Sequence, residues 1–178
     1  MLSKKEIRAE MKRRESAFSL SDAAVAEVWA SVEASAEFAA AHTVLVYMDI
    51  PGEVPTLEFI ERWRGLKRIL IPLVVGDELE LCEYDPLHLV EGYKGIKEPS
   101  ADAVRVPPSE VDLALVPGVA FCERDGRLWR LGRGKGFYDR LLPQMDCPKF
   151  GIYFPFRLVD ELPLDSWDQP LQIMTQNG

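Results

Sequence analysis

The chain has 178 residues, of which 47% are hydrophobic and 28% are charged, which is the length and composition of one globular domain spanning residues 1–178. Its formal net charge of −8 argues against a nucleic-acid partner, because phosphate neutralisation requires basic patches that most of the chain lacks. The N-terminal stretch lacks the apolar core of a signal peptide, and no run approaches the roughly twenty apolar residues that span a bilayer, so we expect a cytoplasmic protein without a membrane partner.

Two helices are predicted near the N-terminus. Ser3 and Glu6 have the spacing of a capping box, and an apolar pair four residues apart follows them, which predicts a helix over residues 4–17. Lysines and arginines crowd the exposed face of this helix, a pattern typical of a solvated surface. A second, alanine-rich helix is predicted from the cap at Ser21, with valines and a tryptophan at core-facing spacing.

Apolar runs then alternate with helical patterns. The β-branched run 43–48 is typical of a strand buried on both faces, and a helix is predicted over residues 56–64. The runs 67–75 and 78–84 flank a Gly-Asp turn, which predicts a hairpin.

The second half of the chain begins with a looser segment, residues 86–110, whose proline-bearing part, residues 98–110, we interpret mainly as a long surface connection. The run 111–121 predicts another buried strand, and Asp125-Gly126 predicts a second hairpin. A helix over about 136–144 and a strand over 149–154 follow.

This alternation predicts an α/β fold: a single-domain, three-layer α/β/α sandwich with a mostly parallel, Rossmann-like sheet. Ligands of such sheets bind outside the carboxyl ends of the strands. Three loops are therefore expected on one rim: the loop after residue 48, the loop after residue 117 and a glycine-rich loop at 132–136.

The cysteines and histidines do not indicate a metal site. Cys82, Cys122 and Cys147 are widely spaced, which favours packing roles over a disulfide framework or a CxxC-type site. His42 and His88 lack partners at metal-ligand spacing and are interpreted as surface residues.

The stretch WRLGRGKGFYDRLL, residues 129–142, alternates three glycines with Arg133 and Lys135. Glycines let backbone N–H groups approach phosphate oxygens, while the cations neutralise phosphate charge and a helix starting near Gly136 would direct its first amides inward. A small anionic ligand therefore suits this loop, and a solvated turn between a strand and a helix is the alternative. The stretch fits neither the Walker A pattern, since Gly136 stands where its hydroxyl belongs, nor the dinucleotide fingerprint GxGxxG.

The segment VPGVAF, residues 116–121, followed by RLGRGKGFYDR, residues 130–140, resembles the signature of the 5-formyltetrahydrofolate cyclo-ligase family, also called methenyltetrahydrofolate synthetases. The resemblance covers most of the chain, through KKEIR at 4–8, YMDIPGEVPT at 47–56, GIKEP at 95–99 and WDQP at 167–170. It implies an enzyme that uses ATP and Mg²⁺ to close 5-formyltetrahydrofolate, with or without a polyglutamate tail, into 5,10-methenyltetrahydrofolate, releasing ADP and phosphate.

The resemblance also implies roles for individual residues. Asp139 and Asp168 match the magnesium ligands, and Glu53 matches a residue that contacts the folate. From the chemistry of phosphoryl transfer we assign catalytic roles to Arg133 and Lys135. Glu53 is the third catalytic residue, which we expect to hydrogen-bond the pterin or formamide nitrogen. The implied nucleotide contacts are Lys4, Lys5, Glu6, Ile7, Arg8, Arg130, Leu131, Gly132, Arg133, Gly134, Lys135, Gly136, Phe137 and Tyr138. The implied folate contacts are Met48, Glu53, Arg133, Gly134, Lys135, Gly136 and Phe137.

Three residues depart from the family pattern. Phe137 replaces the first tyrosine of a Tyr-Tyr pair, Trp167 replaces a histidine and Gln172 replaces an acid. We expect a monomer. Two other classes of function stay open: a folate-binding or regulatory protein that has lost the reaction, and a sugar-phosphate isomerase or CoA-transferase-like enzyme on a related sandwich.

Overall fold

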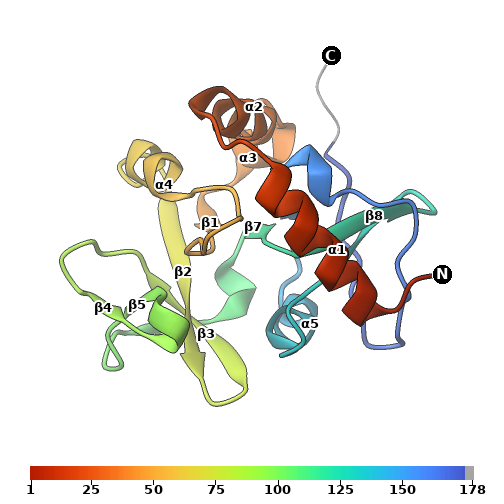
Figure 1. The fold of residues 1–178 in the computed structure, drawn as a ribbon. Helices are drawn as coiled ribbons and strands as arrows, with labels where there is room; N and C mark the ends of the chain where they lie inside the picture. The colour runs from red at the N-terminus through yellow and green to blue at the C-terminus, as the bar shows by residue number, and fades with distance from the viewer. Residues whose placement is uncertain (175–178) are drawn as a thin grey trace.

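A six-stranded sheet forms the centre of the computed structural model, which describes residues 1–174 (Figure 1). The strand order is β10-β7-β1-β2-β3-β6, in which β10, β7, β1 and β2 pair in parallel and β3 and β6 extend the sheet in antiparallel pairings. These strands are β1 (Thr43–Leu45), β2 (Arg68–Val75), β3 (Glu78–Glu83), β6 (Arg105–Val106), β7 (Leu113–Val116) and β10 (Lys149–Gly151). The predicted α/β fold with a mostly parallel sheet is confirmed.

The parallel strands β1, β2 and β7 bury side chains on both faces of the sheet, which explains their continuous apolar runs. Val44 belongs to the core on one face and Leu45 to the core on the other. The first core is covered by the helices α2 (Asp22–Glu33), α3 (Ala36–Ala40) and α4 (Leu57–Trp63). The second is covered by α5 (Phe137–Leu141), the following 3₁₀ turn (Leu142–Gln144) and a hairpin, so one outer layer is only partly helical.

That hairpin consists of β8 (Ala120–Arg124) and β9 (Arg127–Leu131), with its turn at the predicted Asp125-Gly126. The helix α1 (Lys4–Ala17) packs on it through Ile7 and Met11. As a result, the first turns of α1 lie beside the end of β9, where the glycine-rich loop begins (Figure 1).

Most predicted elements are present. The capping box of Ser3 and Glu6 begins α1, and Ser21 caps α2 through a hydrogen bond from the backbone N–H of Ala24. The two antiparallel hairpins form where the sequence predicts them.

Four predictions need correction. The run 111–121 is two strands in different sheets, because Pro117 has no N–H and the chain turns at Pro117-Gly118. Regular pairing ends at residue 45 in β1 and at residue 151 in β10, and the α-helical part of 136–144 ends at residue 141, just before Pro143.

The segment 86–110 is also more ordered than expected. It contains a two-stranded hairpin of β4 (Leu89–Glu91) and β5 (Lys97–Pro99), the strand β6, and 3₁₀ turns at Tyr93–Gly95 and Pro108–Glu110. The last 3₁₀ turn of the fold is Pro155–Arg157.

The cysteines and histidines have the expected roles. Cys82 and Cys122 are buried, Cys147 is half-buried and all three are free thiols, whereas His42 and His88 are exposed. None of the helices within residues 1–174 is long and apolar enough to cross a membrane.

Candidate functional site

A cavity of about 950 Å³ lies where the loops after β1 and β7 meet the glycine-rich loop. The three loops expected on one rim therefore meet, and α1, the strands β2 and β3, the turn at 93–96 and the turn at 165–168 also contribute to the lining. The predicted site residues that line the cavity are Lys4, Arg8, Met48, Glu53, Arg130, Leu131, Gly132, Arg133, Gly134, Lys135, Gly136, Phe137, Tyr138, Asp139 and Asp168.

Three predicted nucleotide contacts lie outside this lining. Ile7 is buried in the core between α1 and the β8–β9 hairpin. The Glu6 carboxylate caps α1 by accepting a hydrogen bond from the backbone N–H of Ser3 at 2.7 Å, and Lys5 is exposed on the same helix.

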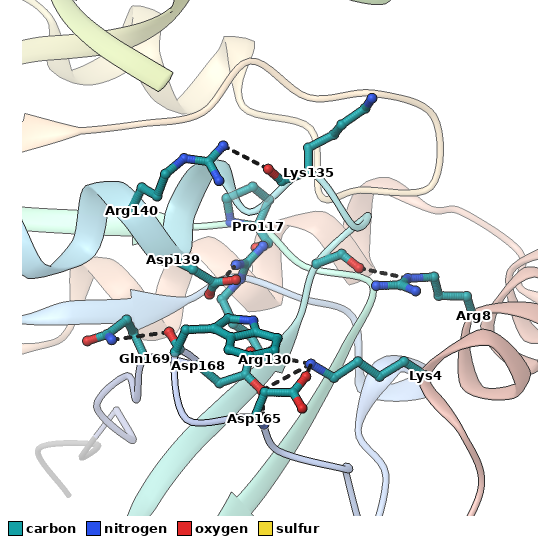
Figure 2. A network of polar contacts seen from close by, with 12 residues as sticks. Lys4, Arg8, Pro117, Arg130, Lys135, Asp139, Arg140, Asp165, Asp168 and Gln169 are labelled. Carbon is teal, nitrogen blue, oxygen red and sulfur yellow. Dashed lines mark hydrogen bonds and ion pairs between the residues drawn. The ribbon is translucent and has the colours of Figure 1, made fainter. Parts of the chain in front are cut away.

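The backbone path of the glycine-rich loop requires glycine. Gly134 and Gly136 have φ angles of +99° and +71°, in the left-handed region that other residues rarely adopt. Its two ends are anchored: Arg8 Nε donates to the carbonyl oxygen of Gly132 at 3.0 Å, and Arg140 Nη2 donates to that of Lys135 at 2.8 Å (Figure 2). The loop is thus a fixed wall of the cavity, while the Lys135 side chain extends away from the acidic residues below it (Figure 2).

Carboxylates and cations alternate below the loop. Lys4 Nζ lies 2.6 Å from Asp165 Oδ2 and 3.1 Å from Asp168 Oδ2, and Arg130 Nη1 lies 3.9 Å from Asp139 Oδ1 (Figure 2). The backbone N–H of Asp165 also donates to Asp168 Oδ2 at 2.7 Å. The Asp168 side chain is only 6% exposed, so its orientation is fixed by these two partners.

The two predicted magnesium ligands fit a divalent cation. Burial raises the pKa of Asp139, the charge of Arg130 opposes this shift, and the nearby charge of Asp168 adds to it. A bound cation would stabilise the ionised Asp139 carboxylate and would therefore oppose the increase in pKa caused by burial and by the charge of Asp168. No group of three or more metal-ligating side chains occurs within residues 1–174, but Mg²⁺ is commonly held by one or two carboxylates together with substrate phosphates and water.

Glu53 lies on the loop after β1 and is nearly buried. Its Oε2 accepts a hydrogen bond from the backbone N–H of Ile50 at 3.1 Å, and its Oε1 lies 3.5 Å from Arg133 Nη2. Burial raises the pKa of Glu53, and the Ile50 N–H and the Arg133 charge oppose that shift. The carboxylate is therefore incompletely solvated and retains capacity for another hydrogen bond.

The loop that carries Glu53 is held by hydrogen bonds that the sequence did not reveal. Tyr47 Oη donates to the carbonyl oxygen of Val54 at 2.7 Å, and Asp49 accepts two hydrogen bonds from Thr56. Arg157 is fully buried and donates to the carbonyl oxygen of Gly52. Glu53 is thus presented by a braced loop rather than by a mobile one.

The opposite end of the cavity is mostly apolar and was missed in the sequence, because part of it comes from residues 93–98 of the looser segment 86–110, to which no site was assigned. Tyr93 contacts Phe137 edge-to-face with ring centroids 5.6 Å apart. The buried Glu98 carboxylate accepts hydrogen bonds from the backbone N–H groups of Val74 and Tyr93, both at 2.7 Å. The GIKEP motif at 95–99 was the feature of the sequence that could have indicated this end of the cavity.

The three departures from the family pattern have different consequences. Phe137 keeps an aromatic contact in the cavity, and Trp167 lines the cavity from an exposed position. Gln172 lies outside the lining, where its side-chain oxygen accepts a hydrogen bond from the backbone N–H of Lys149 at 3.1 Å.

Comparison with known proteins gives a consistent result. Residues 1–176 match the model of the 5-formyltetrahydrofolate cyclo-ligase family. The 5-formyltetrahydrofolate cyclo-ligase of Escherichia coli K12 is 38% identical over 140 residues, covering 74% of this chain and 75% of the relative. That of Mycoplasma pneumoniae is 42% identical over 136 residues, covering 74% and 71%. The solved structure of Aquifex aeolicus 5,10-methenyltetrahydrofolate synthetase has a TM-score of 0.82 and 33% identity, covering 94% of this chain and 86% of that one.

Proposed function

The chain belongs to the 5-formyltetrahydrofolate cyclo-ligase family, and we propose that it uses ATP and Mg²⁺ to cyclise 5-formyltetrahydrofolate to 5,10-methenyltetrahydrofolate through a phosphorylated formyl intermediate. The observation that carries this proposal is a single cavity that joins the anchored glycine-rich loop, the pair Asp139 and Asp168, and the buried Glu53. This combination favours an active ligase over a homologue that only binds folate.

The chemistry explains why a nucleotide is needed. The formyl oxygen of an amide is a poor leaving group, so it first attacks the γ-phosphorus of ATP, and the bond from that phosphorus to the β–γ bridging oxygen breaks to release ADP. N10 of the folate then attacks the formyl carbon and loses its proton. Phosphate departs with the former formyl oxygen, which completes the ring.

The basic residues of the loop are suited to the first step. Phosphoryl transfer requires preorganised donors where negative charge is spread over the γ-phosphoryl oxygens. Lys135 supplies a mobile cationic donor, and Arg133 supplies a forked one. The glycines allow backbone N–H groups to come close to the phosphate oxygens. Lys4 and Arg8 add charge from α1 and extend the nucleotide site away from β1.

Asp139 and Asp168 are the residues that would hold the magnesium ion. When bound, the ion would neutralise phosphate charge and orient the phosphates. Lys4 already balances Asp168, and Arg130 lies near Asp139, so the carboxylates are oriented before a nucleotide arrives.

We assign Glu53 and Met48 to contacts with the folate. We assign to the Glu53 carboxylate a hydrogen bond that it accepts from an N–H of the pterin, because the formamide nitrogen is fully substituted and has no hydrogen to donate. Its burial makes such a bond stronger than it would be in water. The apolar end of the cavity offers space for the planar rings of the folate.

The direct test is an assay with purified protein, ATP, Mg²⁺ and 5-formyltetrahydrofolate, in which the ultraviolet absorption band of the methenyl product should appear. Omission of ATP or of Mg²⁺ should abolish the band. With folate labelled by ¹⁸O at the formyl group, the label should appear in the released phosphate. A folded protein that yields no band at saturating folate contradicts the activity, and unlabelled phosphate contradicts the phosphorylated intermediate alone.

A further inference from the structure

Trp167 is the largest exposed apolar side chain of the charged end of the cavity. It is 61% exposed, whereas Trp29 is 3% exposed, and Trp63 and Trp129 are half-buried. A tryptophan buries a large area when it finds a partner, so leaving one in solvent is costly. Because Trp167 also lines the cavity, a ligand in the cavity can cover it.

The turn that carries Trp167 is rigid. The backbone N–H of Asp168 donates to the carbonyl oxygen of Asp165 at 3.1 Å, and the N–H of Asp165 donates to Asp168 Oδ2 at 2.7 Å. The side-chain amide of Gln169 donates to the carbonyl oxygen of Trp167 at 3.2 Å. The indole is therefore presented by a fixed backbone, which lowers the entropy cost of a stacking contact.

Its neighbours are the groups proposed to bind phosphates and metal. Lys4 Nζ lies 6.0 Å from the centre of the Trp167 ring and forms ion pairs with Asp165 and Asp168. Glu53 and Met48, the proposed folate contacts, come instead from the loop after β1. A flat aromatic face beside cations and carboxylates matches a nucleotide, which combines a flat base with phosphates, better than it matches the folate rings.

We propose that the indole of Trp167 stacks on the base of the bound nucleotide and forms a base subsite separate from the phosphate site of the glycine-rich loop. This inference rests on the proposed function, because it needs ATP as the co-substrate. The subsite acts mainly on affinity, since the base takes no part in phosphoryl transfer.

Intrinsic tryptophan fluorescence gives a readout that does not depend on turnover. Mg²⁺–ADP should quench the emission of the wild-type protein, whereas inorganic tripolyphosphate, which has no base, should bind without the same quenching. Trp167→Phe should lose the ADP-dependent quenching. The matched control is Trp63→Phe, which removes a tryptophan of α4 outside the cavity and should keep the quenching.

Affinities separate stacking from a structural role. Trp167→Leu should weaken Mg²⁺–ADP binding about tenfold, the size expected for a lost base–aromatic stack, and should leave the affinity for tripolyphosphate unchanged. Trp167→Phe should restore most of the ADP affinity because it keeps an aromatic ring. Circular dichroism serves as the folding control, and an exposed side chain contributes little to the core.

Four results overturn the subsite. Equal losses for ADP and tripolyphosphate in Trp167→Leu would indicate a phosphate-site or folding defect. Quenching by 5-formyltetrahydrofolate but not by ADP would place the folate at Trp167. Unchanged ADP affinity in Trp167→Leu would show that the base binds elsewhere while the proposed function stands, whereas absence of any nucleotide binding by the wild-type protein refutes both.

Discussion

The two ends of the cavity differ in their chemistry and in how they are built. The charged end is formed by α1, the glycine-rich loop and the turn at 165–168, and its carboxylates are balanced by lysine and arginine. The apolar end is formed by β2, β3 and the turn at 93–96, and the buried Glu98 carboxylate acts there only as a brace for backbone N–H groups. The difference supports the proposal that a polyanion binds at one end of the cavity and a planar ring system at the other.

Glu53 lies between these two ends and shares features of both. It is buried like Glu98, but its carboxylate lies beside the cationic Arg133 in the cavity. Burial raises the pKa of Glu53. Variants at the charged end should therefore affect the nucleotide, and a variant at Glu53 should affect the folate.

The largest effect is expected at Lys135. Lys135→Ala removes a point charge that can follow the phosphate oxygens, so kcat/KM for ATP should fall on the order of a hundredfold at any Mg²⁺ concentration. Initial rates over a range of ATP concentrations measure it. The matched control is Lys12→Ala on the exposed face of α1, which should behave like the wild type. Recovery of the Lys135 variant by excess Mg²⁺ would contradict a role in phosphate binding.

A smaller loss of kcat/KM is expected for Glu53→Gln, and it should concern 5-formyltetrahydrofolate rather than ATP. Loss of a charge-assisted hydrogen bond should reduce kcat/KM for 5-formyltetrahydrofolate by roughly ten- to a hundredfold. The affinity for ATP should hardly change, which calorimetry can measure. If ATP affinity fell while folate affinity stayed constant, Glu53 would belong to the charged end.

The charged end was easier to predict from the sequence than the apolar end. Residues 130–139 carry the three glycines, several cations and one proposed metal ligand within a short contiguous motif, and each residue type has a distinct chemistry. The apolar end is assembled from Pro72, Leu79 and Tyr93 on separate elements, and such side chains have the same pattern as an ordinary core. The long apolar run 111–121 likewise concealed the break at Pro117-Gly118, because both resulting strands are buried.

Asp139→Asn tests whether Asp139 holds a magnesium ion at the charged end. The amide keeps one oxygen ligand of nearly the same shape but removes the charge, so the Mg²⁺ concentration for half-maximal rate should rise at least about tenfold, with recovery in excess metal. A magnesium titration of initial rates measures this. Asp146→Asn, at an exposed position outside the cavity, is the control. An unchanged magnesium midpoint would show that Asp139 does not hold the ion.

The smallest effect concerns folding and arises from the burial of Glu53. Its pKa is raised in the folded protein, chiefly by burial, above the ordinary value of 4.5. Below pH 4.5 the Glu53 carboxyl is protonated in both the folded and the unfolded state, so it does not lower the free energy of unfolding. As pH rises through 4.5, the unfolded state ionises first, and the wild-type protein loses stability until the folded pKa is passed.

Glu53→Gln cannot ionise, and its side-chain oxygen can still accept the hydrogen bond from the backbone N–H of Ile50. At pH 7 the variant should therefore melt about 2 °C above the wild type, although it is the poorer enzyme. The difference in Tm should shrink as pH is lowered toward 4.5, whereas Glu27→Gln on the exposed face of α2 should show no such trend. A lower Tm for Glu53→Gln at pH 7 would mean that the ion pair with Arg133 outweighs burial, and Glu53 would then stabilise the fold as well as bind the folate.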